Sequence, residues 1–343
     1  MLRKIFITSL LILAGLFSLY IAPVPEQEKT GFAMNTIIRM MIYSRDNNLL
    51  DDAYKLLARL DNELSMYNKS SDISQINILS GQKKFSTSHE VIDAVKDSRR
   101  LYNLTEGVFN PLIGAVTRLW KINTADKILP SRESLDIAIK LSDINNLEID
   151  EKENYIFLRE RGCVLDLGGI AKGFASEKIA DLFKSRGVKS GIIDLGGNIY
   201  AIGLKNDGES WNIGIRDPLE PSGSPALVLS VSDSAVITSG NYERYKIVDG
   251  RRFSHFFDPK TGESIQSDLL SVTIITSDGS LADGLATAFM ITGSERAINL
   301  SRKITPAPGI VLFRQDSRGA PEILASKNIK DSIKRNKYPV KFF

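Results

Sequence analysis

The 343-residue chain has little cysteine, little histidine and little net charge. Its single cysteine, Cys163, excludes an internal disulfide, and the apolar neighbours of this residue favour a buried, unreactive thiol over a nucleophile. The formal net charge of +3 results from 44 basic and 41 acidic side chains, and this balance is too weak and too even for a nucleic-acid-binding surface. We therefore expect no nucleic-acid partner, and we expect the basic stretch 327–341 to be a solvated tail.

One apolar run stands at the N-terminus. Arg3 and Lys4 precede the apolar residues 5–22, which is the layout of a secretory signal or a signal anchor. At roughly 18 residues the run is near the lower limit for spanning a bilayer, and no small-x-small cleavage site precedes Pro23, which favours an uncleaved anchor. Arg3 and Lys4 would then stay on the cytoplasmic side of the membrane.

This layout predicts how the chain divides and where it is found. We expect residues 1–30 to be a signal peptide or signal anchor plus a linker, and residues 31–343 to be one exported domain. The domain would be periplasmic or attached to the outer face of the cytoplasmic membrane. No cysteine lies near the end of the apolar run, so we do not expect a lipid-modified lipoprotein.

The rest of the chain has an ordinary globular composition, with 43% hydrophobic and 25% charged residues. Residues 36–313 contain no clear break, which predicts a single elaborate α+β domain with flanking helices. A strand is predicted over 36–44, and a hairpin is predicted from 155–159 and 164–167. Apolar spacing and start signals predict helices over 49–67, 89–103, 131–141, 171–184 and 280–291.

The most informative motif is LDLGGIAKG, residues 165–173. It follows a short apolar segment, 163–165, that reads as a strand, and it leads into the predicted helix 171–184. Gly168 and Gly169 allow close backbone approach, and the start of a helix offers free N–H groups to an anion. The motif therefore suits a phosphate group, although glycines after a strand are more often a structural turn.

Part of this motif occurs twice. The run Leu-Asp-Leu-Gly-Gly at 165–169 is repeated as Ile-Asp-Leu-Gly-Gly at 193–197, with the predicted helix between the two. One interpretation is a strand–helix–strand unit. The other is that two strand ends independently need tight turns, and the sequence alone does not decide between them.

Two further features carry chemistry. Asp283 and Thr287 are four residues apart in a predicted helix, so their oxygens face the same way and make a plausible half-site for Mg²⁺. The simpler interpretation is an acid in the first turn of the helix and a threonine whose hydroxyl bonds to its own backbone. His255 precedes a turn at 258–262, and its near-neutral pKa would let it accept a proton. The other histidine, His89, has no motif around it and is expected at the surface or at a helix cap.

With these motifs the chain resembles the FAD:protein FMN transferase (ApbE) family, whose members are secreted or membrane-attached, magnesium-dependent flavin transferases. The resemblance extends over most of the chain, from about residue 34 to residue 293. The matching pieces, in chain order, are MNT (34–36), SMYNKSSDISQIN (65–77), GVFNPLIG (107–114), LDLGGIAKG (165–173), IDLGGNIYAIG (193–203), WNIGIRDP (211–218), SGNYERY (239–245), HFFDPKTG (255–262) and ADGLATA (282–288).

The resemblance implies a fold and a set of site residues. The fold would be an ApbE-like, T-fold-related domain with a mixed or antiparallel sheet. Mg²⁺ would be held by Asp283, Thr287 and the carbonyl of Gly169, with Asp283 also catalytic and His255 as the base. The FAD-binding residues would be Met34, Tyr67, Val108, Phe109, Asn110, Asp166, Lys172, His255 and Phe257.

Three positions depart from the usual family pattern. Asn35 stands where a glycine is usual, Asn110 where an aspartate is usual, and Phe256-Phe257 where an aliphatic pair is usual. Because these positions lie in pieces that would line the flavin pocket, the departures bear on its details. None of them coincides with an expected metal ligand.

The expected activity is magnesium-dependent transfer of FMN from FAD to a threonine or serine hydroxyl of an acceptor redox protein, with release of AMP. A second reading is a magnesium-dependent FAD pyrophosphatase that uses water as the acceptor. A third is an exported FAD-binding protein without turnover. The expected partners are FAD, the acceptor protein and the membrane.

Overall fold

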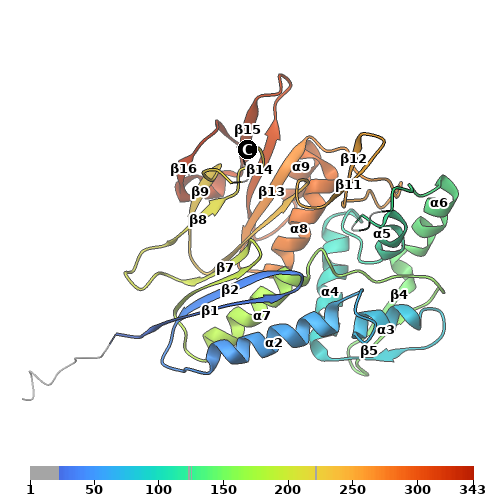
Figure 1. Cartoon of the computed structure of the whole chain (residues 1–343), viewed down its shortest axis with the longest axis horizontal. Helices are drawn as coiled ribbons and strands as arrows, with labels where there is room; N and C mark the ends of the chain where they lie inside the picture. Colours follow the sequence, from blue (N-terminus) through green and yellow to red (C-terminus); the bar gives the residue numbers. More distant parts are fainter. Residues whose placement is uncertain (1–22, 123, 125, 221) are drawn as a thin grey trace, which may run out of the picture.

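In the computed structural model, which describes residues 23–122, 124, 126–220 and 222–343, a nine-stranded sheet forms the centre of the protein (Figure 1). The strand order is β1-β2-β6-β7-β10-β13-β14-β15-β17, and every pair is antiparallel except β15–β17. The strands are β1 (Glu26–Ala33), β2 (Thr36–Tyr43), β6 (Ser190–Leu195), β7 (Asn198–Gly203), β10 (Ser234–Gly240), β13 (Leu269–Thr276), β14 (Gly309–Gln315), β15 (Pro321–Ala325) and β17 (Val340–Phe342).

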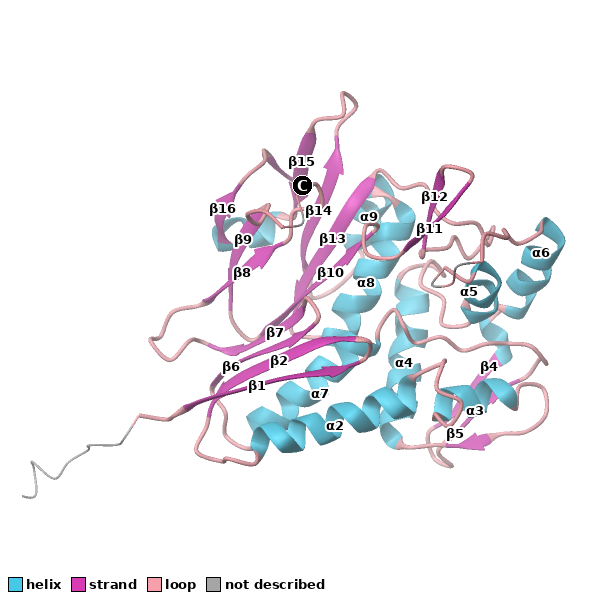
Figure 2. Ribbon diagram, in the orientation of Figure 1, coloured by secondary structure: helices cyan, strands magenta, loops and turns pink. Residues whose placement is uncertain are grey.

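Helices cover one face of this sheet, and α2, α7 and α8 make the most extensive contacts with its strands (Figure 2). The α-helices are α2 (Leu49–Leu64), α3 (Asp72–Ile78), α4 (His89–Leu104), α5 (Gly114–Trp120), α6 (Arg132–Leu141), α7 (Ala171–Ser185), α8 (Gly279–Thr292) and α9 (Ser294–Ser301). Two short 3₁₀ helices span Ile144–Asn146 and Lys327–Ser332. The fold is thus the α+β domain with a mixed sheet and flanking helices that the sequence predicts.

Three small sheets complete the described part of the fold. The sheet β16 (Ile333–Asn336), β9 (Leu227–Val231) and β8 (Trp211–Ile215) packs on the face of the central sheet opposite the helices. The sheet β3 (Phe85–Ser86), β5 (Tyr155–Leu158) and β4 (Leu147–Asp150) adjoins α3 and α4. The third is the two-stranded hairpin of β11 (Tyr245–Val248) and β12 (Arg251–Ser254).

The alternation of side chains along the strands produces two cores. In β10, Ala235 and Ile237 face the helices, whereas Val236 between them faces the small sheet β16-β9-β8. Successive residues of a strand point to opposite faces, so a strand that is covered on both faces is apolar throughout. This accounts for the continuous apolar runs of the central strands.

Most of the predicted helices have the expected bounds, but α2 ends at Leu64 instead of residue 67. The predicted hairpin of 155–159 with 164–167 is wrong, because β5 pairs with β3 and β4. Residues 163–167 do not form a strand either, and Val164 makes only an isolated parallel bridge with Ile113. Residues Lys327–Ser332, β16 and β17 are folded, so the prediction of a solvated basic tail is also wrong.

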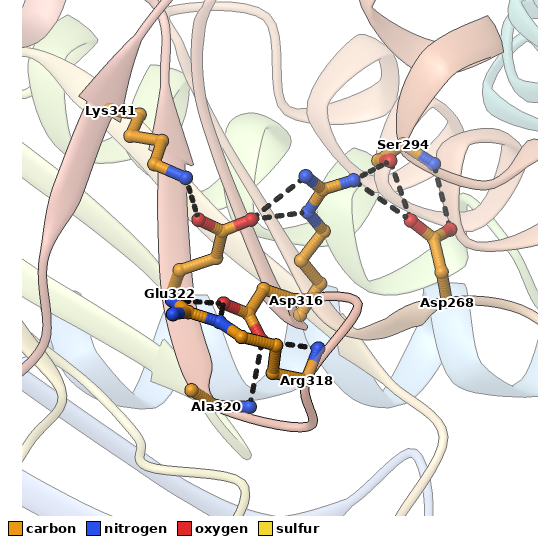
Figure 3. A network of polar contacts seen from close by, with 8 residues as sticks. Asp268, Ser294, Asp316, Arg318, Ala320, Glu322 and Lys341 are labelled. Atoms are coloured by element: carbon orange, nitrogen blue, oxygen red, sulfur yellow. Dashed lines mark hydrogen bonds and ion pairs between the residues drawn. The ribbon is translucent and has the colours of Figure 1, made fainter.

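Ion pairs attach the last strand to the sheet (Figure 3). The carboxylate of Glu322 in β15 is buried and pairs with both Lys341 of β17 and Arg314 of β14, which lowers the pKa of Glu322. Arg314 also donates to the Ser294 hydroxyl at 2.9 Å, and the Ser294 N–H donates to Asp268 at 3.0 Å. These contacts connect α9 with three strands at the end of the chain.

The N-terminal boundary differs from the expected one. Residues 26–30, predicted as linker, belong to β1 and pair with Arg39–Tyr43 of β2. The apolar run 5–22 lies outside the described residues, and no helix within the described part of the chain is long and apolar enough to cross a bilayer.

Two truncations test this boundary. A chain starting at Pro23 keeps all of β1, whereas a chain starting at Gly31 loses the pairs from Glu26↔Tyr43 to Thr30↔Arg39. We expect the Gly31 start to lower the free energy of unfolding by about 1–5 kcal/mol relative to the Pro23 start, at roughly 0.2–1 kcal/mol per cross-strand pair. Urea unfolding of the two chains measures the difference. Equal stabilities would mean that residues 26–30 contribute nothing to the sheet.

Candidate functional site

A cavity of about 370 Å³ lies where α5, α7, α8 and the end of β10 converge. It brings together every residue predicted for the site except Met34. The predicted residues that line it are Tyr67, Val108, Phe109, Asn110, Asp166, Gly169, Lys172, His255, Phe257, Asp283 and Thr287. These residues come from five of the matching sequence pieces, so the fold assembles positions that are far apart in the chain.

Met34 is not among the residues that line the cavity. Met34 and Asn35 form the two-residue turn of the β1–β2 hairpin, with φ values of 49° and 59°. Turns of this kind need a positive φ at both central residues, and asparagine adopts that conformation more readily than most residues. Asn35 therefore suits the position where the family usually has glycine. The N–H of Met34 donates to Asp61 Oδ2 of α2 at 2.9 Å, which fixes the hairpin end to that helix.

Helices α7 and α8 cross in close contact and cap each other. The N–H of Gly173 in α7 donates to Asp283 Oδ2 of α8 at 2.9 Å, and the N–H of Gly279 in α8 donates to Glu177 Oε2 of α7 at 2.7 Å. A Cβ at Gly173 would lie 2.1 Å from the Gly279 carbonyl oxygen, so the approach requires glycine. The crossing places the Asp283 carboxylate at the N-terminus of α7, beside Lys172.

This arrangement corrects one part of the phosphate prediction. At the start of α7, the Gly173 N–H is already bonded to Asp283, and the Ala171 N–H donates to the Leu167 carbonyl at 2.9 Å. These backbone donors are therefore not free for an anion, and the side chain of Lys172 remains as a phosphate-binding group in the cavity.

Asp166 does not cap α7. Its Oδ1 accepts from the Gly168 N–H at 2.9 Å, and the N-cap residue Ile170 has no side-chain cap. In the repeated motif, Asp194 Oδ1 accepts from Gly197 N at 2.7 Å in the turn that joins β6 to β7. The two runs are therefore two aspartate-stabilised glycine turns in different settings, and the strand–helix–strand interpretation is wrong.

Oxygen atoms suited to a hard cation lie together on one wall. Gly169 and Thr287 are adjacent, since a Cβ added to Gly169 would lie 3.4 Å from Thr287 Oγ1. Asp283 is 4% exposed, and burial raises the pKa of its carboxyl while the Lys172 charge opposes that rise. A carboxylate, a hydroxyl and a carbonyl match the donors that Mg²⁺ prefers. Within the described residues no cluster of three or more His, Cys, Asp or Glu side chains could hold a metal ion. The donors at this wall include only one side chain of these types, that of Asp283.

His255 lines the same cavity and is held in one orientation. Its Nδ1 lies 3.0 Å from the carbonyl oxygen of Arg244, and its ring packs against Phe256 with centroids 4.0 Å apart. Because a carbonyl only accepts, Nδ1 carries the proton and Nε2 has a free lone pair. Burial lowers the pKa of His255 to about 4, with the charges of Arg244 and Lys172 acting in the same direction. The imidazole is thus neutral at pH 7, and its pKa is lower than the sequence suggests.

The remaining predicted residues form an apolar end and a polar rim. Val108 and Phe109 are buried, Phe257 stacks on Trp120 with centroids 5.5 Å apart, and the Tyr67 ring is 67% exposed at the opening. Asn110 uses both ends of its amide: Nδ2 donates to the Ser142 carbonyl at 2.8 Å and Oδ1 accepts from Leu112 N at 2.9 Å. An aspartate could not donate to that carbonyl, which explains the asparagine here.

Several cavity residues were not singled out from the sequence. Glu243 and Arg244 line the cavity from the loop after β10, and Arg118 and Thr117 line it from α5. Burial raises the pKa of Glu243, and the Lys172 charge opposes the rise. The sequence signal that could have identified Glu243 and Arg244 is the SGNYERY piece, because it is one of the pieces that match the family and it contains both residues. Charged residues in a polar loop otherwise resemble ordinary solvated surface.

Solved structures of flavin transferases have this fold. The flavin transferase ApbE from Vibrio cholerae superposes with a TM-score of 0.80 and 27% identity, covering 90% of this chain and 100% of that one. The flavinyl transferase ApbE of Pseudomonas stutzeri, in its apo form, gives a TM-score of 0.81 and 26% identity, covering 93% and 100%.

The sequence comparisons agree. A FAD:protein FMN transferase from Treponema pallidum is 32% identical over 331 residues, which is 91% of this chain and 90% of the relative. One from Vibrio cholerae is 29% identical, over 90% of this chain and 93% of the relative. The model of the ApbE family matches residues 34–310. The chain therefore belongs to the ApbE family and is a transferase, as its sequence predicts.

Proposed function

We propose that this protein transfers FMN from FAD to a threonine or serine hydroxyl of an acceptor protein and releases AMP. The acceptor oxygen attacks the phosphorus of the FMN half, the bond from that phosphorus to the bridging oxygen breaks, and AMP leaves with the bridging oxygen. The hydroxyl proton passes to His255 Nε2. The observation that carries the proposal is the neutral His255 with a free Nε2, in one cavity with Asp283, Thr287 and Lys172.

The donor set fits Mg²⁺, and we propose that Asp283, Thr287 and the Gly169 carbonyl hold it. When bound, Mg²⁺ supplies neutralisation of the pyrophosphate charge and makes AMP a better leaving group. The chain's own contribution is the buried carboxylate, kept in place by the Gly173 N–H at 2.9 Å. A preorganised carboxylate needs no reorientation during the reaction, which is how a rigid site lowers a barrier.

Other side chains would bind and orient FAD. Lys172 supplies a positive charge to the phosphate oxygens. Asp166, whose pKa is raised by burial, would contact polar groups of the flavin nucleotide. The flavin ring would contact an aromatic and apolar surface formed by Tyr67, Val108, Phe109, Asn110 and Phe257. Met34 does not line the cavity, and we propose it as a further FAD contact on the family resemblance alone. In-line attack depends mainly on this positioning.

We also propose that the protein is exported and acts at the outer face of the cytoplasmic membrane or in the periplasm, attached through residues 1–22 and without lipid modification. An acceptor would then be an exported redox protein. The proposal rests on the charge and apolar pattern of the N-terminal sequence.

The test is to incubate the full chain with FAD and Mg²⁺, with and without exported redox proteins, and to measure AMP and the mass of each protein. We expect AMP together with a mass increase of one FMN on a threonine or serine, and loss of both products when the metal is chelated. AMP without a labelled protein would indicate the pyrophosphatase reading. Unchanged FAD would indicate a binding protein without turnover.

A further inference from the structure

The β11–β12 hairpin grows directly out of the candidate site. Tyr245 pairs with Ser254 in its ladder, so Arg244 and His255 are the next residues on the two strands. These two are joined by the contact between His255 Nδ1 and the Arg244 carbonyl at 3.0 Å, and both line the cavity. The hairpin therefore carries the proposed base at its root, and its position is coupled to that of the site.

One face of the hairpin is fixed to the body of the protein. Lys246, Val248 and Phe253 are buried, Lys246 Nζ donates to the Trp120 carbonyl at 2.9 Å, and the Phe253 and Trp120 ring centroids are 5.4 Å apart. Trp120 ends α5, another wall of the cavity. The hairpin is thus packed as part of the domain, and it lies at the outer edge of the molecule (Figure 2).

The other face carries exposed apolar surface. The side chains of Tyr245 and Ile247 are 45% and 55% exposed. The guanidinium of Arg252 lies over the Tyr245 ring at 3.9 Å from its centroid, on the same face. Tyrosine and arginine are the residue types most enriched at protein interfaces, where flat side chains give contact area at low entropic cost.

The charge of this face lacks a counter-ion. Arg252 is exposed, and among residues 23–122, 124, 126–220 and 222–343 no carboxylate lies within ion-pair distance of it; its guanidinium donates to the Asn241 carbonyl instead. Other arginines on the surface do pair, for example Arg39 with Glu28 at 2.7 Å. A cation that has no carboxylate partner in the described part of the chain, and that lies beside exposed apolar side chains, is suited to an acidic and apolar segment of another molecule.

We propose that the outer face of the β11–β12 hairpin, formed by Tyr245, Ile247 and Arg252, docks the acceptor protein through an acidic and apolar segment beside the modified hydroxyl. This inference rests on the proposed function. Any protein that delivers a hydroxyl to His255 Nε2 must cover the surface next to the cavity opening, and this face continues from His255 along the hairpin. That continuity favours the acceptor over an anionic lipid surface.

The test uses the full chain with the double variant Ile247→Glu/Arg252→Glu, two cross-strand neighbours on this face, and the acceptor identified by the mass measurement above. We expect the KM for the acceptor to rise at least tenfold, with kcat at saturating acceptor and FAD affinity within twofold of wild type. The matched control is Lys334→Glu/Arg335→Glu, two exposed cations of β16 outside the cavity lining, which should change none of these values. Because exposed charges are screened by salt, the wild-type KM should rise with ionic strength more steeply than that of the double variant.

The outcomes are distinguishable. If wild type labels the acceptor and the double variant has an unchanged KM, the docking inference is overturned while the proposed function stands. If wild type labels no protein, the proposed function fails and the inference fails with it. An unchanged KM together with lost binding to phosphatidylglycerol vesicles would assign the face to lipid instead. Should the double variant unfold, Ile247→Ser and Arg252→Gln serve as milder variants, each expected to raise KM about threefold.

Discussion

Replacing His255 with alanine should slow FMN transfer by about 100- to 10,000-fold, the usual contribution of a positioned general base. The imidazole is held by the Arg244 carbonyl so that Nε2 is free, and the substitution removes the one histidine among the described residues that line the cavity. FAD and Mg²⁺ should bind the variant normally, because the proposed metal ligands and most of the flavin wall are untouched. Single-turnover labelling of the acceptor measures the rate, and flavin fluorescence measures FAD affinity.

The pH dependence separates a base from a structural residue. With a pKa lowered to about 4, His255 is already unprotonated at neutral pH. The wild-type rate should therefore hold between pH 7 and about pH 5 and fall as the imidazole takes up a proton near pH 4. The alanine variant should lack this acid limb, and its rate should rise with pH as solvent hydroxide replaces the missing base.

The control for this variant is His89→Ala. His89 is exposed at the first position of α4, outside the cavity, so its replacement should leave the transfer rate unchanged. Transfer at the wild-type rate by the His255 variant would make His255 structural. A loss of FAD affinity in proportion to the loss of rate would make it a binding residue.

The sequence predicts helices well where their apolar faces are regular. The helices around 89–103, 131–141 and 171–184 have bounds within a residue or two of α4, α6 and α7, and Ser131, predicted within the helix, is the N-cap of α6. Each carries a periodic stripe that tertiary packing does not override.

Short strands and glycine turns are harder to predict because their meaning depends on distant partners. The two Asp-Leu-Gly-Gly runs have the same local chemistry, yet one joins paired strands and the other follows an extended segment with a single bridge. Only long-range pairing decides this, and local sequence carries no record of it. Likewise β5 is correctly located but pairs with β3 and β4, which lie earlier in the chain.

The candidate site was predictable for side chains that belong to recognisable motifs. It was not predictable for contacts that depend on helix packing or for residues in loops. Asp283, Thr287, Lys172 and His255 come from recognisable pieces and meet in one cavity. The occupation of the Gly173 N–H by Asp283 was not predictable, because it depends on how closely α7 and α8 approach. Glu243 is a further example, since nothing in its local sequence distinguishes it from a solvated acid.

The close crossing of α7 and α8 makes Asp283 the best position for testing the metal proposal. Its carboxylate is buried, and asparagine has nearly the same shape and keeps an oxygen that can accept from the Gly173 N–H. Asp283→Asn therefore removes the charge and spares the helix contact. A matched pair on the same helix, Thr287→Val and Thr292→Val, compares a hydroxyl in the cavity with one outside it.

We expect Asp283→Asn to lower metal-dependent turnover by about 1,000-fold or more, because several kcal/mol of charge stabilisation would be lost and about 1.4 kcal/mol corresponds to a factor of ten. FAD affinity should stay within a few-fold, since the lost charge holds the metal and not the flavin ring. In Asp283→Asn, the rise in melting temperature that Mg²⁺ produces in the presence of FAD should disappear. Thr287→Val should raise the Mg²⁺ concentration needed for half-maximal rate, whereas Thr292→Val should leave it unchanged. Wild-type turnover of Asp283→Asn at saturating FAD would refute the metal assignment, whereas an unfolded variant would show that the Asp283 charge, and not only its shape, holds the two helices together.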